Sequence, residues 1–338
     1  MSTPFTHALV IGGTGMIGAH ALRACLARGI RVRALARPNS DRGNLEGLGN
    51  VEIAVGDLGD PASLSTALRG CDLLIHTAGT YPARHFGKAA LLARARRHLS
   101  HLLNAVQEAP ELKRWVYVSS CATIGIPEGP GGEPAPHSRP ARESDSRFPV
   151  PDDSPYFAVK AEMERMVMSD PERAVIVNPT LCVDELDSRL TTAQVLLPLA
   201  RGMMPAYLPG QLNAVPTRDV GEGILLAAER GRCGERYILG AENMSCRDFL
   251  ARCARIAGVS APRFALPFFI AEAASLATEV WARATGTAPL FPMAGVRMMK
   301  HSQTYDTSKA REELGFRPFA VDDAIERAFT WYRTQGLL

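Results

Sequence analysis

The 338-residue sequence predicts an α/β fold, with a Rossmann-type, doubly wound parallel sheet followed by a smaller, mostly helical C-terminal region. Two observations support this prediction. Short apolar or β-branched runs alternate with helical patterns through the first half of the chain, as parallel strands joined by helical crossovers do. After about residue 179 this alternation stops and helical patterns dominate.

Six strands are expected in the first half, each a short run rich in Val, Ile, Leu or Ala: His7–Ile11, Arg31–Ala36, Val51–Val55, Asp72–His76, Arg114–Ser119 and Arg173–Val177. The expected helices between them are Met16–Arg28, which ends at Gly29, Pro61–Arg69, Ala89–Glu108 and Ser154–Ser169. Residues 124–154, dense in Pro, Gly, Ser and charge, are expected to form a long loop that contributes to specificity.

The second half is expected to hold helices at Leu190–Arg201, Val220–Glu229, Ser245–Ile256, Ala271–Ala284 and Val321–Thr334, with an isolated strand at Glu235–Leu239. We therefore divide the chain into two domains. Residues 1–178 plus about 213–240 form an expected dinucleotide-binding domain, and residues 179–212 and 241–338 form an expected substrate-binding domain.

Composition and charge exclude several classes of protein. A net charge of +3 without a concentrated basic stripe gives no indication of nucleic-acid binding. Seven cysteines, without a Cys-x-x-Cys pair, are typical of reduced cytoplasmic thiols and predict no structural metal site. The N-terminus lacks a signal-peptide pattern, and the apolar stretch Phe264–Ala277 is too short and too charged to span a bilayer. We expect a cytoplasmic protein that acts on a small molecule.

A glycine-rich segment stands where the first strand turns into the first helix, and it reads Ile11-Gly12-Gly13-Thr14-Gly15-Met16-Ile17-Gly18. Glycine there lets the backbone approach a diphosphate, whose charge the helix N-terminus stabilises. Two glycine spacings fit, so the segment predicts a dinucleotide site without choosing between dehydrogenase classes. The expected cofactor-binding residues are Gly12, Thr14, Gly15, Met16, Ile17 and Gly18.

The end of the second strand indicates which dinucleotide binds. Proteins that bind NAD usually carry an acid there, which binds the ribose 2′-hydroxyl. This sequence has Arg37 instead, with Arg33 nearby. A guanidinium pairs with a 2′-phosphate, so Arg37 favours NADP. NAD is the alternative if Arg37 is an ordinary solvated side chain.

Two further strand ends are expected to contact the cofactor. Asp57 and Leu58 follow the third strand, where the Asp57 carboxylate could accept the adenine amino group. Thr77, Ala78 and Gly79 follow the fourth strand, where small residues let a cofactor lie against the backbone. Ligands bind at these carboxyl ends in parallel sheets. Ordinary turns are the alternative at both places.

An acid–base pair is expected on the helix that begins near residue 154. Tyr156 and Lys160 lie one turn apart on one helix face. A neighbouring ammonium favours the phenolate, and moving the pKa of a phenol from about 10 to 7 needs roughly 4 kcal/mol. Ser120 ends the fifth strand, where its hydroxyl could bind a substrate oxygen, whereas strand alternation turns Ser119 away. A surface Tyr–Lys pair is the alternative.

Together, Gly12–Gly18, Asp57-Leu58, Ser120 and the Tyr156–Lys160 pair resemble an extended short-chain dehydrogenase/reductase of the NAD-dependent epimerase/dehydratase family. The similarity is to the dihydroflavonol-reductase-like branch that includes hopanoid-associated sugar epimerases. It continues through residues 176–179, 218–223, 234–240 and 310–318.

The resemblance implies a catalytic triad of Ser120, Tyr156 and Lys160, with Tyr156, Lys160 and Pro179 also contacting the cofactor. It implies that Asn178 faces the nicotinamide or the substrate, and that the protein is a homodimer joined through two helices. One position departs from the family, because Ala95 stands where an asparagine is usual.

The function expected on this basis is NAD(P)-dependent chemistry on a secondary alcohol or ketone. A nucleoside-diphosphate-sugar epimerase is the first interpretation, a carbonyl reductase the alternative, and a non-catalytic NADP sensor the third. Arg189, Arg201 and Arg218 could bind a sugar-nucleotide diphosphate, but solvated or paired side chains are the favoured interpretation.

Overall fold

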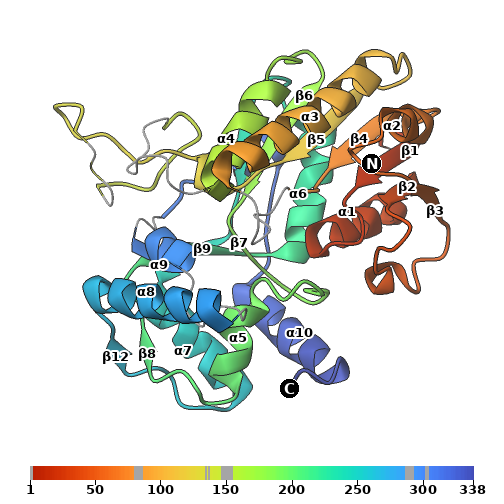
Figure 1. Ribbon diagram of the computed structural model, residues 1–338. Coiled ribbons are helices and arrows are strands. Elements are labelled where there is room, and N and C mark those ends of the chain that lie inside the picture. Colours follow the sequence, from red (N-terminus) through yellow and green to blue (C-terminus); the bar gives the residue numbers. More distant parts are fainter. Residues whose placement is uncertain are drawn as a thin grey trace.

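The computed structural model describes residues 3–79, 87–133, 135, 138–145, 155–285, 293–300 and 304–338. In this part of the chain, seven parallel strands form the main sheet: β1 (His7–Ile11), β2 (Arg31–Ala36), β3 (Val51–Val55), β4 (Leu73–His76), β5 (Arg114–Val118), β6 (Ala174–Pro179) and β10 (Arg236–Leu239). Their order is β3-β2-β1-β4-β5-β6-β10, which confirms the predicted doubly wound sheet (Figure 1). The order reverses between β1 and β4, where such sheets bind ligands.

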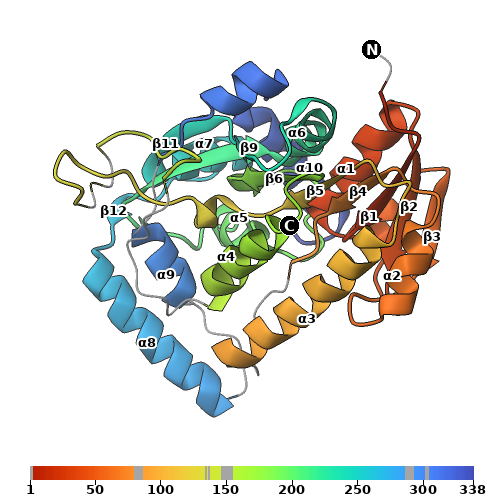
Figure 2. The ribbon, with the colours of Figure 1, turned by 90° about the horizontal axis from the view of Figure 1, so that it is seen from above.

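Helices cover both faces of this sheet (Figure 2). One face packs against α1 (Met16–Ala27) and α6 (Thr217–Arg230), and Val10 belongs to that core. The other face packs against α2 (Pro61–Leu68), α3 (Lys88–Gln107) and α4 (Pro155–Val167), and Leu9 belongs to that core. Successive strand residues point to opposite faces, so a strand buried on both sides must be apolar throughout.

The C-terminal region carries the expected helices, one helix that was not predicted (Met293–Lys300) and more strand than predicted. Its helices are α5 (Ala193–Ala200), α7 (Cys246–Ala257), α8 (Phe268–Thr285), α9 (Met293–Lys300) and α10 (Val321–Thr334). Among the described residues, β7 (Leu181–Val183), β9 (Gln211–Pro216) and β11 (Glu242–Ser245) form a three-stranded sheet, and β8 (Ala206–Tyr207) pairs with β12 (Phe264–Ala265). Short turns complete the list: η1 (Gly43–Leu45), η2 (Cys121–Thr123) and η3 (Ala310–Leu314).

Two predictions for this region were wrong. The strand expected at Glu235–Leu239 is not isolated, because β10 pairs with β6 at the edge of the main sheet. The strand β9 was not expected, because the polar residues Gln211 and Asn213 interrupt its apolar pattern. Asn213 is buried, and side-chain hydrogen bonds with Thr180 (2.8 Å) and Asn243 (2.8 Å) satisfy it. Both errors concern pairing between distant segments.

None of the described helices is long and apolar enough to cross a membrane. Part of the long loop, residues 146–154, lies outside the described residues. The helices α3 and α4 pack against each other, and the expected homodimer stays a prediction.

Candidate active site

The glycine turn lies at the carboxyl end of β1 and holds the backbone of three segments in close contact. Gly12 has φ +91°, a conformation that favours glycine, and a Cβ there would lie 2.6 Å from Thr77 Oγ1 and 2.7 Å from Ala78 N. A Cβ on Gly18 would overlap the Gly12 carbonyl oxygen. By contrast, a Cβ on Gly15 would meet only Gly12 O, at 3.5 Å. Two of these glycines are required for packing, and Gly15 leaves open space.

The first turn of α1 has the features of an anion-binding site. Gly15 is the N-cap residue and offers no capping side chain, and no acidic residue stands in the first turn. The N–H groups at the start of a helix need acceptors, and the helix dipole favours negative charge there. Thr14, Met16 and Ile17 are half-buried around this turn. The arrangement fits the diphosphate of a dinucleotide.

The neighbouring strand ends place the other expected cofactor residues at the same edge. Arg37 is exposed directly after β2, whereas Arg33 lies near the amino end of that strand and pairs with Glu52 (2.7 Å). Asp57 follows β3 and accepts a hydrogen bond from Gly59 N (2.8 Å), and Leu58 beside it is half-buried. Thr77 follows β4 and donates to Ile11 O (3.1 Å), and Ala78 and Gly79 after it are half-buried.

The predicted catalytic groups come from the end of β5 and from α4, which packs against η2. Ser120 is half-buried and caps η2, and its Oγ accepts a hydrogen bond from Ala122 N (3.2 Å). Lys160 is buried, and its Nζ donates to the carbonyls of Val118 (3.2 Å) and Ser119 (3.4 Å). Tyr156 is half-buried one helical turn before Lys160.

Burial controls the charge of Lys160. Desolvation lowers the pKa of its ammonium to about 8, and the negative charge of Glu164 opposes that decrease. The Nζ atom also lies 5.5 Å from the centroid of the Tyr117 ring. A lysine whose pKa lies this close to neutrality is typical of a functional site.

The structure adds a buried polar network that the sequence did not indicate. Asn178 is fully buried, and three acceptors lie within hydrogen-bond distance of its Nδ2: Ser120 O (3.0 Å), Thr123 Oγ1 (2.9 Å) and Glu164 Oε1 (2.6 Å). The amide NH₂ of Asn178 is therefore occupied inside the protein. Contact of Asn178 with substrate stays a prediction, as does the cofactor contact of Pro179, which is buried at the end of β6.

Two more buried polar groups lie behind this network. His76 and Tyr117 are opposite each other on β4 and β5, with ring centroids 5.5 Å apart. No described group forms a hydrogen bond with either ring nitrogen of His76. The Tyr117 hydroxyl also has no hydrogen-bond partner among the described residues. Desolvation lowers the pKa of His76 to about 3, so its ring is neutral in the folded protein. Ala95, at the position of the family asparagine, is buried in the core on this side.

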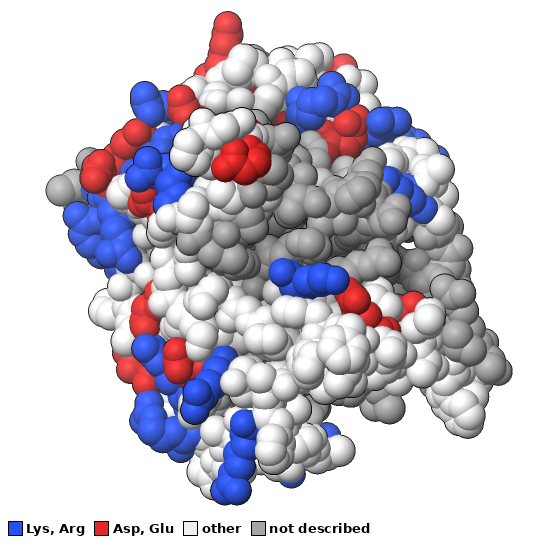
Figure 3. All heavy atoms as spheres, turned by 90° about the vertical axis from the view of Figure 1, so that its left-hand side faces the viewer, with Lys and Arg blue, Asp and Glu red and all other residues white. Residues whose placement is uncertain are grey.

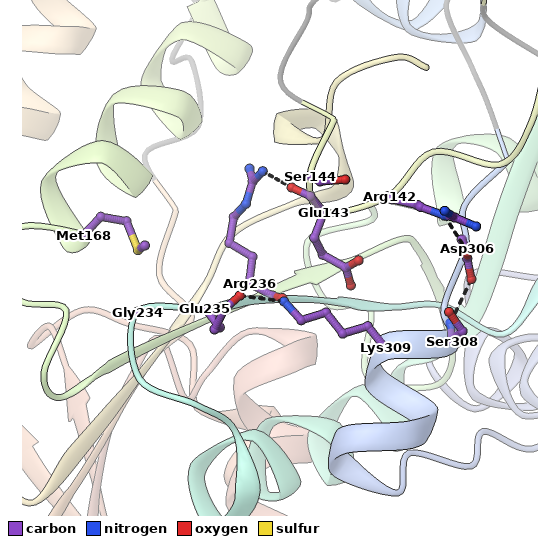
Figure 4. A pocket seen from close by; sticks show the side chains of 10 residues that line it. All are labelled: Arg142, Glu143, Ser144, Met168, Gly234, Glu235, Arg236, Asp306, Ser308 and Lys309. Carbon is purple, nitrogen blue, oxygen red and sulfur yellow. Dashed lines mark hydrogen bonds and ion pairs between the residues drawn. The ribbon is translucent and has the colours of Figure 1, made fainter. Parts of the chain in front are cut away.

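A cavity of about 520 Å³ lies elsewhere, beside the start of β10. Its charged side chains pair among themselves or with buried acids: Arg142 with Asp306 (2.8 Å), Lys309 with Glu235 (2.8 Å), and Arg236 with Glu164 (3.3 Å). Figure 4 shows Arg236 extending from β10 towards the backbone of Glu143. Neither the glycine turn nor Tyr156 lines this cavity, so it is not the predicted active site.

The sheet order, the glycine turn and the residues at the sheet edge define a dinucleotide-binding protein of the extended short-chain dehydrogenase/reductase type. Residues 8–240 match the model of the NAD dependent epimerase/dehydratase family, and the chain belongs to that family. This confirms the resemblance seen in the sequence.

Similar proteins span nearly the whole chain. A Synechocystis sp. protein described as "Putative dihydroflavonol 4-reductase" is 34% identical, over 97% of this chain and 94% of its own. "Sterol demethylase protein B" of Methylococcus capsulatus is 32% identical, over 98% of this chain and 99% of its own. A crystal structure described as a nucleoside-diphosphate-sugar epimerase from Pseudomonas aeruginosa is 30% identical with a TM-score of 0.77, and covers 98% of this chain and 99% of its own.

Proposed function

We propose that this protein is an NAD(P)-dependent oxidoreductase that interconverts a secondary alcohol and a ketone, with Ser120, Tyr156 and Lys160 as its catalytic residues. The observation that carries the proposal is the buried Lys160 ammonium, one turn from Tyr156 and anchored to the strand that ends at Ser120. A lysine in this position can favour the phenolate of a neighbouring tyrosine.

Each residue has a separate task in this proposal. Tyr156 donates a proton to the carbonyl oxygen in reduction, and removes it from the alcohol in oxidation. The Ser120 hydroxyl donates a hydrogen bond to the same oxygen. The Lys160 ammonium, one helical turn away, would favour the phenolate form of Tyr156. Bound NAD(P) supplies or accepts the hydride.

The residues that would hold the cofactor fit it. The uncapped first turn of α1 would bind the diphosphate, and Thr77, Ala78 and Gly79 would lie along it. Asp57 would accept the adenine amino group. Arg37 is exposed at the end of β2 and would pair with the 2′-phosphate of NADP, the cofactor we prefer over NAD.

Of the two substrate classes, we favour a carbonyl compound without a diphosphate. Arg201 donates instead to Leu337 O (2.8 Å), and Arg218 pairs with Glu185 (3.4 Å), so two of the three arginines considered for a diphosphate have other partners. In the view of Figure 3, the described acidic and basic side chains lie interspersed and form no large patch of one sign. The relative named as a dihydroflavonol 4-reductase agrees with this choice.

The division of the chain stays as the sequence predicted it: residues 1–178 with about 213–240 for the cofactor, and the remainder for the substrate. We also propose a cytoplasmic homodimer that contacts through α3 and α4.

Tyr156→Phe tests the function. NADPH oxidation is followed with cyclohexanone, 2-decalone and a 3-ketosteroid, and conversion of UDP-glucose to UDP-galactose is followed in parallel. We expect turnover of at least one ketone, and a loss of about 10²- to 10⁴-fold in Tyr156→Phe without loss of NADPH affinity. Tyr207→Phe, on the short strand β8, is the matched control and is expected to keep the parent rate.

Two results would count against the proposal. Full activity in Tyr156→Phe would remove the assigned acid–base residue. Interconversion of the UDP-sugars, without net NADPH consumption and without any ketone turnover, would favour the epimerase.

A further inference from the structure

Glu164 is a buried carboxylate that no part of the proposed chemistry uses. It lies on α4, one helical turn after Lys160, and is 6% exposed. A carboxylate is costly to bury unless hydrogen bonds and opposite charge compensate it. Here Oε1 accepts from Thr123 Oγ1 (2.5 Å) and Asn178 Nδ2 (2.6 Å), and Oε2 faces Arg236 Nη1 (3.3 Å).

The two side chains that donate to Glu164 also hold the turn that carries Ser120. Thr123 Oγ1 lies 2.8 Å from Ser120 O, and Asn178 Nδ2 lies 3.0 Å from the same oxygen. The Ser120 carbonyl, Thr123, Asn178 and Glu164 therefore form one connected cluster between η2, β6 and α4. Asn178 Oδ1 has no hydrogen-bond partner among the described residues, but the hydrogen bonds that connect the other groups restrict the geometry of the Ser120 turn.

We propose that Glu164 is a positioning residue for the reaction, which fixes the Ser120 turn against the helix that carries Tyr156 and Lys160 and places a negative charge one helical turn from the Lys160 ammonium. This inference rests on the proposed function. Glu164 acts through Ser120 and Lys160, and it is not itself placed in contact with substrate.

The charges around Lys160 agree with the second role. Tyr156 precedes it on α4, and Tyr117 and His76 face it from β5 and β4. His76 is neutral, and its ring offers no negative charge. Burial lowers the pKa of Lys160, and Glu164 is the group that raises it. Arg236, from β10, is the basic side chain that pairs with Oε2 of Glu164 (3.3 Å).

The first test measures Lys160 directly and needs neither cofactor nor turnover. The chain has lysine at 88, 113, 160, 300 and 309. Lysine labelled with ¹³C at Cε gives a small set of NMR signals, and Lys160→Arg identifies the signal of Lys160. We expect Glu164→Gln to lower the pKa of Lys160 by about one unit. Glu162→Gln is the matched control, because Glu162 lies on the same helix but pairs with Arg96 and Arg165.

The second test measures turnover of the probe ketone with NADPH. In Glu164→Gln we expect kcat to fall about tenfold or more with KM changed less than about twofold, and the loss of activity at high pH to begin at lower pH, because Lys160 loses its proton earlier. Thr123→Val removes the hydrogen bond from the Thr123 hydroxyl to the Ser120 carbonyl and keeps the charge of Glu164. It is expected to lower kcat several-fold without moving the pKa of Lys160.

The inference is overturned if the pKa of Lys160 and kcat are the same in Glu164→Gln, Glu162→Gln and the parent. If Glu164→Gln does not fold, an unchanged kcat in Thr123→Val overturns the positioning role. Failure of the proposed function is distinguishable, because Tyr156→Phe would then keep full activity whatever Glu164→Gln does.

Discussion

Two alanine substitutions in the glycine turn are expected to have different effects. Gly18→Ala should lower the stability of the protein, whereas Gly15→Ala should weaken cofactor binding. At Gly18 the new Cβ would lie 2.7 Å from the Gly12 carbonyl carbon and 2.8 Å from Gly13 Cα. These are backbone atoms of the turn, so α1 must move away from β1. Overpacking of this kind costs about 1–3 kcal/mol. For a chain of this size the melting temperature should fall by roughly 2–6 °C.

At Gly15 the same methyl group is accommodated by the protein. Its nearest neighbour is Gly12 O at 3.5 Å, an ordinary contact, and φ is −86°, which alanine adopts readily. Stability should change by less than about 1 kcal/mol. The methyl group would instead occupy the space into which the diphosphate fits. We expect NADPH affinity to fall at least tenfold, which is about 1.4 kcal/mol.

The assays are calorimetric melting of the cofactor-free protein and titration of NADPH fluorescence. The reasoning requires that Gly18→Ala loses stability and that Gly15→Ala loses affinity with its melting temperature nearly unchanged. Equal melting temperatures for the two variants, or parent-like NADPH binding by Gly15→Ala, would refute it.

Three further predictions concern the cofactor, the buried histidine and a buried ion pair. Arg37→Ala should weaken NADPH binding about tenfold and leave NADH binding nearly unchanged, because it removes the partner of a 2′-phosphate; fluorescence titration with both cofactors checks this. His76 has a pKa of about 3 when folded and binds a proton below about 6.5 when unfolded, so its burial destabilises the fold as pH falls below 6.5. Urea unfolding at pH 7 and pH 5 measures how much the free energy of unfolding falls between these two pH values. The fall should be smaller by about 2 kcal/mol in His76→Leu than in the parent, and an equal fall would contradict the burial assigned to His76. Asp184 is buried and paired with Arg327 at 2.7 and 3.0 Å, so Arg327→Met should cost about 3–5 kcal/mol in urea unfolding. Arg255→Met, which breaks an exposed pair, should cost less than about 1 kcal/mol, and similar losses in the two variants would contradict this ranking.

The sequence by itself determined six of the seven strands of the main sheet and the place of the glycine turn. Strand and helix patterns are local, and apolar runs such as His7–Ile11 must be buried wherever they lie. Gly12 and Gly18 are required because the backbone of the turn leaves no room for a Cβ at either position. Tyr156 and Lys160 were predicted together because helical periodicity alone places them on one face.

The tertiary structure decided what surrounds those groups. The pairing of β10 with β6, and the hydrogen bonds of the buried Asn213, join segments that are distant in the chain. No local pattern indicates such partners, so the sequence could not predict them.

Residues of the same type also differ in exposure and in role because their partners in the folded chain differ. Arg33 and Arg37 stand four positions apart, yet only Arg37 is exposed at the carboxyl edge of the sheet, whereas Arg33 lies near the amino end of β2 and pairs with Glu52 of the neighbouring strand. Glu162 and Glu164 lie on one helix, but only Glu164 faces inward to the Ser120 turn. The charge state and role of a side chain depend on its desolvation and its partners, and both are properties of the folded chain.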